Sequence, residues 1–456
     1  MMDRSRGAKV WPVALAWALL SAPALADDQS DRIKSLEERL ESNQRLIERL
    51  AARVAELERS SNTAKAPANA ASQAPMQAQN PADAQNSQAL SALRESVDQI
   101  SEGLSKRSSD TGLPVHGFAD VGLANSSGPD PQKLRGFNIG TLELYLTPQF
   151  GNRVKSLFEL AFEFDQEGRA ELELERLQLG YTLNDSLTVW AGRFHTPFGL
   201  WNTLFHHGAN LQTAIFRPRF IDFEDKGGII PAHSVGVWAT GKTALGPGKV
   251  TYDAYLTNGP RVRARSLDFN AFTDDNPGKM LGLNIGYQPT GVLDGLNVGV
   301  HGFGSTVDTY SADSSVLGRT RLRMAGGYLG YDASNWEVIG EYYRFSNSDA
   351  RTGISRPSNA WFAQVGKTFG STTPYVRYES ASLDPNDTYF SSQRLGRSYR
   401  RAVLGARYAV DARSSFKFEL SNTSESSVVL LDENGLPIPF TGVAYRRAAI
   451  QYSIAF

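Results

Sequence analysis

Residues 158–165, FELAFEFD, alternate apolar and acidic side chains almost without interruption. Because successive side chains of an extended chain point to opposite faces, the phenylalanines and the leucine fall on one face, and Glu159, Glu163 and Asp165 fall on the other. The stretch therefore predicts a β-strand with one apolar face and one charged face.

The same two-residue period recurs from residue 113 to the C-terminus, for example in 141–146 and 415–420. After Glu175 the alternation shifts by one residue, which predicts a β-bulge near Arg176. A soluble β-sandwich would show similar alternation, so this feature alone does not identify the fold. Sixteen candidate strands lie near residues 115–124, 137–147, 154–165, 171–183, 186–194, 233–242, 248–258, 280–289, 295–305, 320–331, 335–346, 358–369, 373–383, 398–410, 413–423 and 443–456.

The lengths of the connections between these strands distinguish a β-sandwich from a membrane-spanning β-barrel. Connections after even-numbered strands are short, as at 184–185, 332–334, 370–372 and 411–412. Connections after odd-numbered strands are mostly long, as at 195–232, 259–279, 306–319, 384–397 and 424–442. Short turns on one rim, long loops on the other and an even number of strands are typical of a bacterial outer-membrane barrel. A strand of about 10 residues also matches a tilted crossing of the bilayer.

The last strand supports the same fold, because apolar side chains occupy every second position from Ala448 to the terminal Phe456. A terminal phenylalanine after such a strand resembles the assembly signal of outer-membrane barrels. The sequence thus predicts an all-β fold, a 16-stranded antiparallel transmembrane β-barrel over residues 113–456, preceded by an α-helical coiled coil. A barrel of this size leaves an aqueous channel.

The N-terminus predicts export. Residues 1–26 combine a basic start, an apolar run over 10–20 and the small-residue motif Ala24-Leu25-Ala26, which is typical of a cleaved signal peptide. The alternative is an uncleaved anchor helix, although the apolar run is shorter than the roughly 20 residues that a helical span needs.

Residues 27–59 predict a coiled coil in the periplasm, because apolar residues fill the a and d positions of four heptads with Asn43 as the polar interruption. The heptads leave dimer and trimer open, and the alternative is a lone helix packed on its own barrel. Residues 60–88 have the composition of a low-complexity linker, and 89–112 form a short helical segment.

The connection 195–232 is the longest, and it is rich in aromatic residues. We expect it to fold into the barrel and narrow the channel. The alternative is an exposed loop that contacts other subunits or lipopolysaccharide. The polar residues expected at the constriction are Arg193, His206, His207, Arg217, Arg219, Asp222, Glu224, Asp225 and Lys226.

Two arginine runs each share one face of an extended chain: Arg319, Arg321 and Arg323, and the run at 261–265. Such a ladder predicts an anion path along the channel wall, because each guanidinium binds an anion through two hydrogen bonds. The alternative is that both runs lie in extracellular loops and bind lipopolysaccharide phosphates.

Other classes of function lack support in the sequence. The chain has no cysteine and a net charge of −1, which argues against thiolate chemistry, a disulfide scaffold and a nucleic-acid partner. No enzyme motif occurs in a supporting context. We therefore predict no catalytic residue, no metal and no cofactor.

Residues 187–200, LTVWAGRFHTPFGL, and the preceding 171–186, ELELERLQLGYTLNDS, resemble the phosphate-selective porin O/P family. A G-[RQ]-F-x-x-P-F-G pattern precedes the constriction in that family, and here it is met by Gly192, Arg193, Phe194, Pro197, Phe198 and Gly199. The resemblance implies a 16-stranded porin, a constriction after this strand and, from the N-terminal coiled coil, a homotrimer.

The expected function is passive diffusion of small polar or anionic solutes across the bacterial outer membrane, where lipid and lipopolysaccharide are the surroundings. The rival hypothesis is a structural or recognition barrel whose coiled coil tethers the outer membrane to the cell wall or to a partner.

Overall fold

A computed structural model describes residues 115–130, 135–150, 153–164, 170–205, 209–224, 226–268 and 278–456. The predicted signal peptide, coiled coil, linker and short helical segment, at 1–26, 27–59, 60–88 and 89–112, lie outside the described residues.

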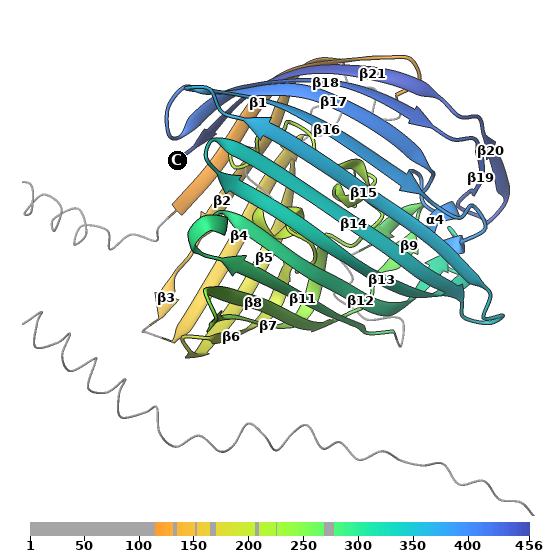
Figure 1. The fold of residues 1–456 in the computed structure, drawn as a ribbon. Helices are drawn as coiled ribbons and strands as arrows, with labels where there is room; N and C mark the ends of the chain where they lie inside the picture. The colour runs from red at the N-terminus through yellow and green to blue at the C-terminus, as the bar shows by residue number, and fades with distance from the viewer. Residues whose placement is uncertain are drawn as a thin grey trace, which may run out of the picture. The chain divides into compact units, whose positions relative to one another are not determined.

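Sixteen long antiparallel strands form one closed sheet (Figure 1). They are β1 (Val115–Ser127), β2 (Arg135–Leu146), β4 (Val154–Phe164), β5 (Ala170–Asn184), β6 (Leu187–His195), β7 (His233–Leu245), β8 (Gly248–Thr257), β11 (Met280–Pro289), β12 (Leu296–Tyr310), β13 (Val316–Ala333), β14 (Trp336–Asp349), β15 (Ser355–Lys367), β16 (Thr372–Ser382), β17 (Tyr399–Ala409), β18 (Ser414–Glu425) and β21 (Ala444–Ala455). The predicted 16-stranded antiparallel barrel is confirmed.

The connections contain short elements. They are β3 (Gln149–Phe150), α3 (Trp201–Leu204), η1 (Arg219–Ile221), β9 (Arg261–Arg263), β10 (Ser266–Asp268), η2 (Gly291–Leu293), α4 (Thr388–Ser391), β19 (Val428–Leu431) and β20 (Pro437–Phe440). Within the described residues, no helix is both long and apolar enough to cross a membrane.

The barrel closes between its first and last strands, because β1 pairs with β2 on one edge and with β21 on the other. At this seam Gly117 N–H donates to the carbonyl of Phe456 at 2.9 Å, and Phe456 N–H donates to that of Gly117 at 3.0 Å. The sheet therefore has no free edge.

Two local predictions have different outcomes. The β-bulge near Arg176 is confirmed, because Glu159 pairs with Arg176 while the next residue, Leu160, pairs with Leu174. The long connection at 306–319 is wrong, because β12 and β13 stay paired until Tyr310 meets Val316. Both strands continue beyond the stretch in which one face is apolar, so the alternation that predicts a strand is not visible there.

Over much of its wall the barrel carries apolar side chains outside and charged side chains inside, the reverse of a soluble protein. In β18, Phe418 is 40% exposed whereas the next residue, Glu419, is 1% exposed. Apolar residues on the exposed face recur on neighbouring strands, as at Leu404 and Val376. A continuous apolar outer surface is what a lipid environment requires.

Aromatic side chains gather at one level of this outer face. Tyr342 of β14 is the register partner of Trp361 of β15, and the Trp361 ring lies 5.6 Å from that of Tyr378 on β16. Outer-membrane barrels carry such a girdle where the bilayer meets water. We call these three residues the aromatic girdle.

Candidate channel site formed by the segment between β6 and β7

The connection from Thr196 to Ala232, which we call segment 196–232, is closed at its base. Thr196 N–H donates to the carbonyl of Ala232 at 2.8 Å. The side-chain amide of Asn202 donates to the carbonyl of Thr196 at 2.9 Å and to that of Ala232 at 3.2 Å. Since its two ends are joined, the segment leaves and rejoins the wall at the same place, between β6 and β7.

Its first turn is held by a carboxylate of β14. Leu200 and Trp201 donate their backbone N–H groups to Oε1 of Glu341, at 3.2 and 2.5 Å. Gly199 makes this approach feasible, because its φ is +61° and a Cβ there would lie 2.2 Å from Oε2 of Glu341. Only glycine meets both conditions without strain.

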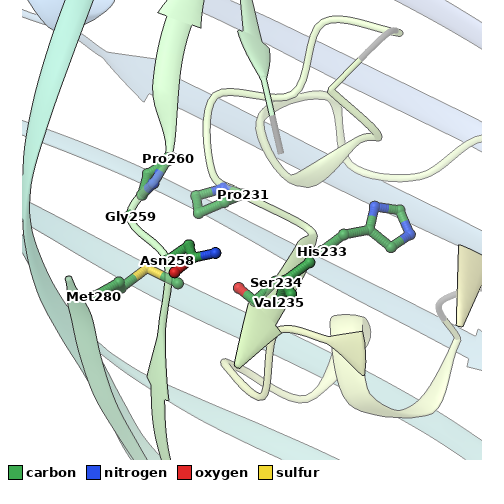
Figure 2. A pocket seen from close by; sticks show the side chains of 8 residues that line it. All are labelled: Pro231, His233, Ser234, Val235, Asn258, Gly259, Pro260 and Met280. Atoms are coloured by element: carbon green, nitrogen blue, oxygen red, sulfur yellow. The ribbon is translucent and has the colours of Figure 1, made fainter. Parts of the chain in front are cut away.

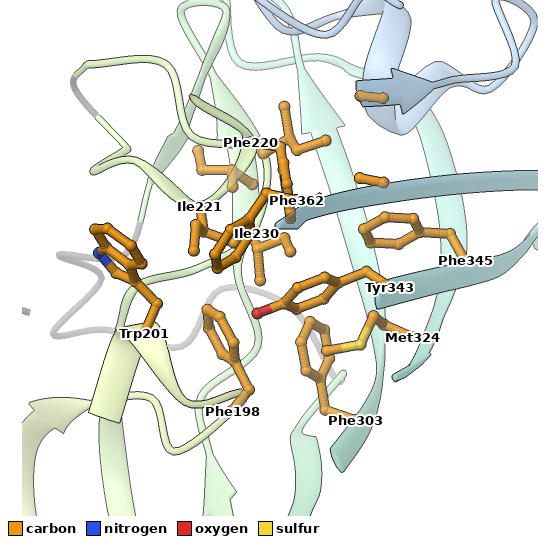
Figure 3. Packing of buried hydrophobic residues seen from close by; sticks show 14 of the residues in the cluster. Phe198, Trp201, Phe220, Ile221, Ile230, Phe303, Met324, Tyr343, Phe345 and Phe362 are labelled. Atoms are coloured by element: carbon orange, nitrogen blue, oxygen red, sulfur yellow. The ribbon is translucent and has the colours of Figure 1, made fainter. Parts of the chain in front are cut away.

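The apolar side chains of the segment pack against the wall. Phe198, Trp201 and Phe220 belong to one buried cluster with Tyr343 of β14 and Phe362 of β15 (Figure 3). The rings of Phe220 and Tyr343 are 5.1 Å apart at 75°, an edge-to-face arrangement that adds to the gain from burial. The aromatic content of the segment is therefore accounted for by internal packing.

Arg217 lies inside the segment. Its guanidinium donates to Oδ1 of Asn202 at 2.8 Å, to the carbonyl of Ile221 at 3.0 and 2.9 Å, and to that of Phe205 at 3.3 Å. Burial lowers its pKa to about 10. The residue holds the fold of the segment together.

Arg219 fastens the segment to β16 and β18. Its backbone N–H donates to Oε2 of Glu379 at 2.7 Å, and its guanidinium forms an ion pair with Glu425. Arg397 binds the other oxygen of Glu425 at 2.6 Å. Two arginines thus share one buried carboxylate.

A buried network behind the segment was not identified from the sequence. Arg377 and Arg401 lie 3.4–3.8 Å from the carboxylates of Glu379 and Glu419, and the second oxygen of Glu419 accepts the N–H of Ile215 at 2.9 Å. In the sequence, these charged residues occupy polar positions of the alternation in 373–383, 398–410 and 413–423. Their pairing across strands is visible only in three dimensions.

On the opposite side, the segment contacts β4 and β7, and a residue of β5 binds next to it. His233 lies between two carboxylates, with Nε2 2.7 Å from Glu175 and Nδ1 3.3 Å from Glu224. Arg193 lies 3.6 Å from the same Glu175. Lys226 reaches Glu163 of β4 at 2.9 Å.

The structure brings together most of the predicted constriction residues. Arg193, Arg217, Arg219, Asp222, Glu224 and Lys226 all lie in the segment or directly against it. Burial raises the pKa of Asp222. His206, His207 and Asp225 lie outside the described residues.

The arginine ladder of β13 lies elsewhere. Arg321 and Arg323 are exposed and alternate with Leu322 and Met324, which are buried in the cluster that contains Phe198. The arginines, with Arg319, therefore occupy the face of β13 that points away from segment 196–232.

Small cavities near the segment do not form a solute site. Figure 2 shows one at the junction of β7, β8 and β11, lined by Pro231, Asn258 and Met280 among others, with a volume of about 10 Å³. Such a space holds roughly one water molecule. Among the described residues, no group of three or more acidic, histidine or cysteine side chains is arranged to hold a metal ion.

Comparisons with known proteins agree on the fold. No family model matches the chain, and no curated protein matches it. An anion-selective porin from Comamonas acidovorans is similar in structure, with a TM-score of 0.52, 13% sequence identity, and coverage of 76% of this chain and 99% of that one. OmpT of Vibrio cholerae in its trimer form (TM-score 0.48, 11% identity, 75% and 98% coverage) and Salmonella typhi OmpF in complex with daunomycin (0.48, 12%, 75% and 97%) also match. The similarity to the Comamonas acidovorans porin shows that the chain has the barrel fold of an outer-membrane porin.

Proposed function

We propose that this chain is an outer-membrane porin, a water-filled channel for passive diffusion of small polar or anionic solutes, narrowed by segment 196–232. The observation that carries the proposal is that this one segment contacts Glu163 of β4, Asn284 of β11, Glu341 of β14, Glu379 of β16 and Glu419 of β18. Strands all around a closed barrel share only their inner face, so these contacts support a location in the lumen.

The surface of the barrel supports a membrane location. Apolar side chains cover much of the face opposite to the segment, and each of the sixteen long strands is paired on both edges. A structure of this kind satisfies its backbone hydrogen bonds within lipid. A sixteen-stranded barrel is also wide enough to keep an aqueous passage beside a folded-in segment.

The charges that remain accessible indicate a passage beside β4 and β5. The side chains of Lys226 and Glu163 are 37% and 25% exposed, whereas the network around Glu419 is buried. Opposed basic and acidic groups along a passage suit polar solutes, anions included, because either sign finds a partner. In this proposal Arg319, Arg321 and Arg323 lie outside the channel, contrary to the expectation from the sequence.

We also propose a homotrimer, with residues 27–59 as its periplasmic coiled coil and a possible contact to the cell wall through it. The heptads of this region and the resemblance to the phosphate-selective porin O/P family support this assembly.

Recording from the purified full-length protein in a planar bilayer tests the function. We expect the conductance to rise in groups of three equal steps, one for each channel of a trimer. We also expect a finite reversal potential in a salt gradient. Absence of conductance from protein that is folded and inserted would refute the channel and favour the tether hypothesis.

A further inference from the structure

The outer face of β13 and β14 carries a cluster of arginines that the channel does not use. Arg321, Arg323 and Arg344 are all exposed. Along both strands, exposed positions such as these alternate with buried positions whose side chains point toward segment 196–232. Arg344 is the register partner of Ala325, the residue two positions from Arg323, so both arginines lie on the same face of adjacent strands. We call these three residues the arginine patch.

In the part of the chain that the structure describes, no carboxylate is left to balance this patch. The acid on the same face is Asp308, and Arg319 binds both of its oxygens, at 2.6 and 2.9 Å. Among the described residues, no ion pair is found for Arg321, Arg323 or Arg344. The patch is therefore a local excess of positive charge on a face that otherwise meets lipid.

Its level in the membrane is fixed by the aromatic girdle. Arg344 lies two residues beyond Tyr342, about 7 Å along the strand, in the direction of the long loops. Gly327 is the register partner of Tyr342, so Arg323 lies four residues beyond the girdle, about 13 Å along β13. Since girdles mark the boundary of the hydrocarbon region, the patch lies at the level of the lipid headgroups.

The neighbours of the patch leave room and offer hydrogen bonds. Arg321 is paired with Thr306 and Ser348, and Arg323 with Gly304. Arginines grouped in this way bind phosphate through paired N–H groups, with planar guanidinium geometry that suits its oxygens. Small and hydroxyl-bearing neighbours allow a bulky phosphorylated group to approach.

We propose that the arginine patch binds the phosphorylated headgroup of a glycolipid of the outer leaflet. This inference rests on the outer-membrane location in the proposed function. A lipid fits better than free phosphate because the basic patch continues directly into apolar surface. Below it, Val300 of β12 is 62% exposed, and Leu329 and Tyr342 are exposed beside it. One amphipathic molecule can place its phosphates on the arginines and its acyl chains on this surface.

The test compares full-length wild-type protein with the triple variant Arg321→Gln, Arg323→Gln, Arg344→Gln in detergent. The probe is fluorescently labelled bisphosphorylated lipid A, with dephosphorylated lipid A and inorganic phosphate as further arms. Arg400→Gln is the matched control, because Arg400 is an exposed outer-face arginine of β17 with serine register partners, Ser380 and Ser424.

We expect the triple variant to bind bisphosphorylated lipid A at least tenfold more weakly than wild type, and the control to bind within twofold. Wild type should bind dephosphorylated lipid A as weakly as the triple variant does. Equal binding by wild type and triple variant would overturn the proposal, and so would full competition by equimolar inorganic phosphate.

Bilayer recording of the same proteins distinguishes a failure of the proposed lipid site from a failure of the proposed channel function. A shift in reversal potential in the triple variant would put the patch in the passage and overturn the lipid site. Specific loss of lipid binding in a protein without conductance would instead refute the channel and support the lipid site.

Discussion

The backbone N–H of Trp201 donates to the carboxylate of Glu341 over 2.5 Å, joining residues that lie 140 positions apart in the chain. The same carboxylate accepts from Leu200 and from the hydroxyl of Tyr343. One wall residue thus holds the first turn of the segment that we propose as the constriction.

Replacement of Glu341 by alanine should loosen this turn, because three buried donors lose their acceptor, at about 1–3 kcal/mol each. We expect Glu341→Ala to give a larger and noisier single-channel conductance. Glu341→Gln retains one acceptor oxygen and should stay close to wild type. Identical traces for all three proteins would contradict the role of this carboxylate.

Lys226 should influence ion preference, since its ammonium is partly exposed beside Glu163. We expect Lys226→Glu to move the reversal potential in a KCl gradient toward cation preference. Arg321→Glu changes the charge equally on the outer face, so it should leave the reversal potential unchanged. An equal shift in both variants would argue against the proposed passage.

Arg217 should control the compactness of the segment through its bonds to Asn202 and Ile221. Arg217→Met leaves these buried acceptors unpaired, and we expect rapid tryptic cleavage within 209–224 in the folded protein. Arg351→Met, in an exposed turn, is the control; it removes a tryptic site outside the segment, and its cleavage within 209–224 should be as slow as in wild type. Resistance of the Arg217 variant to trypsin would show that the segment does not depend on this side chain.

Asp387, in the loop between β16 and β17, should make stability depend on pH. Burial raises its pKa from 3.8 to about 6, while its side chain accepts from Asn347 at 2.7 Å and from the N–H of Tyr389 at 3.0 Å. The folded protein binds the proton more readily than the unfolded chain does. The charged form therefore opposes folding above pH 6, on the order of 3 kcal/mol, and this penalty disappears as the pH falls toward 4.

Asp387→Asn removes the charge and keeps one of the two acceptor oxygens. We expect the variant to unfold at a higher temperature than wild type at pH 8, and the difference to vanish near pH 4. Thermal unfolding in detergent at several pH values measures this. A difference that is constant with pH would contradict the assignment.

The strands of the barrel were predictable because lipid outside and polar groups inside impose a two-residue period. The prediction failed at 306–319, where both faces carry polar residues, such as Asp308 on one face and Thr309 on the other. There the strands extend beyond the apolar band, so the period that reveals a strand is lost.

The position of the arginine ladder was harder to predict. Alternation correctly places Arg321 and Arg323 on one face, but it does not state which face is internal. The usual rule assigns apolar residues to the outside, and Leu322 and Met324 break it because segment 196–232 supplies an apolar core within the barrel. Only the folded arrangement of the segment reveals this inversion.

The paired bonds between Gly117 and Phe456 have a consequence for how the protein is made. The cylinder closes only when β21 is present, since β21 is the partner of both β1 and β18. A truncation that removes β21 therefore leaves two strand edges unpaired and exposed to neighbouring chains. A chain cut short before this strand becomes a template for aggregation rather than a membrane protein.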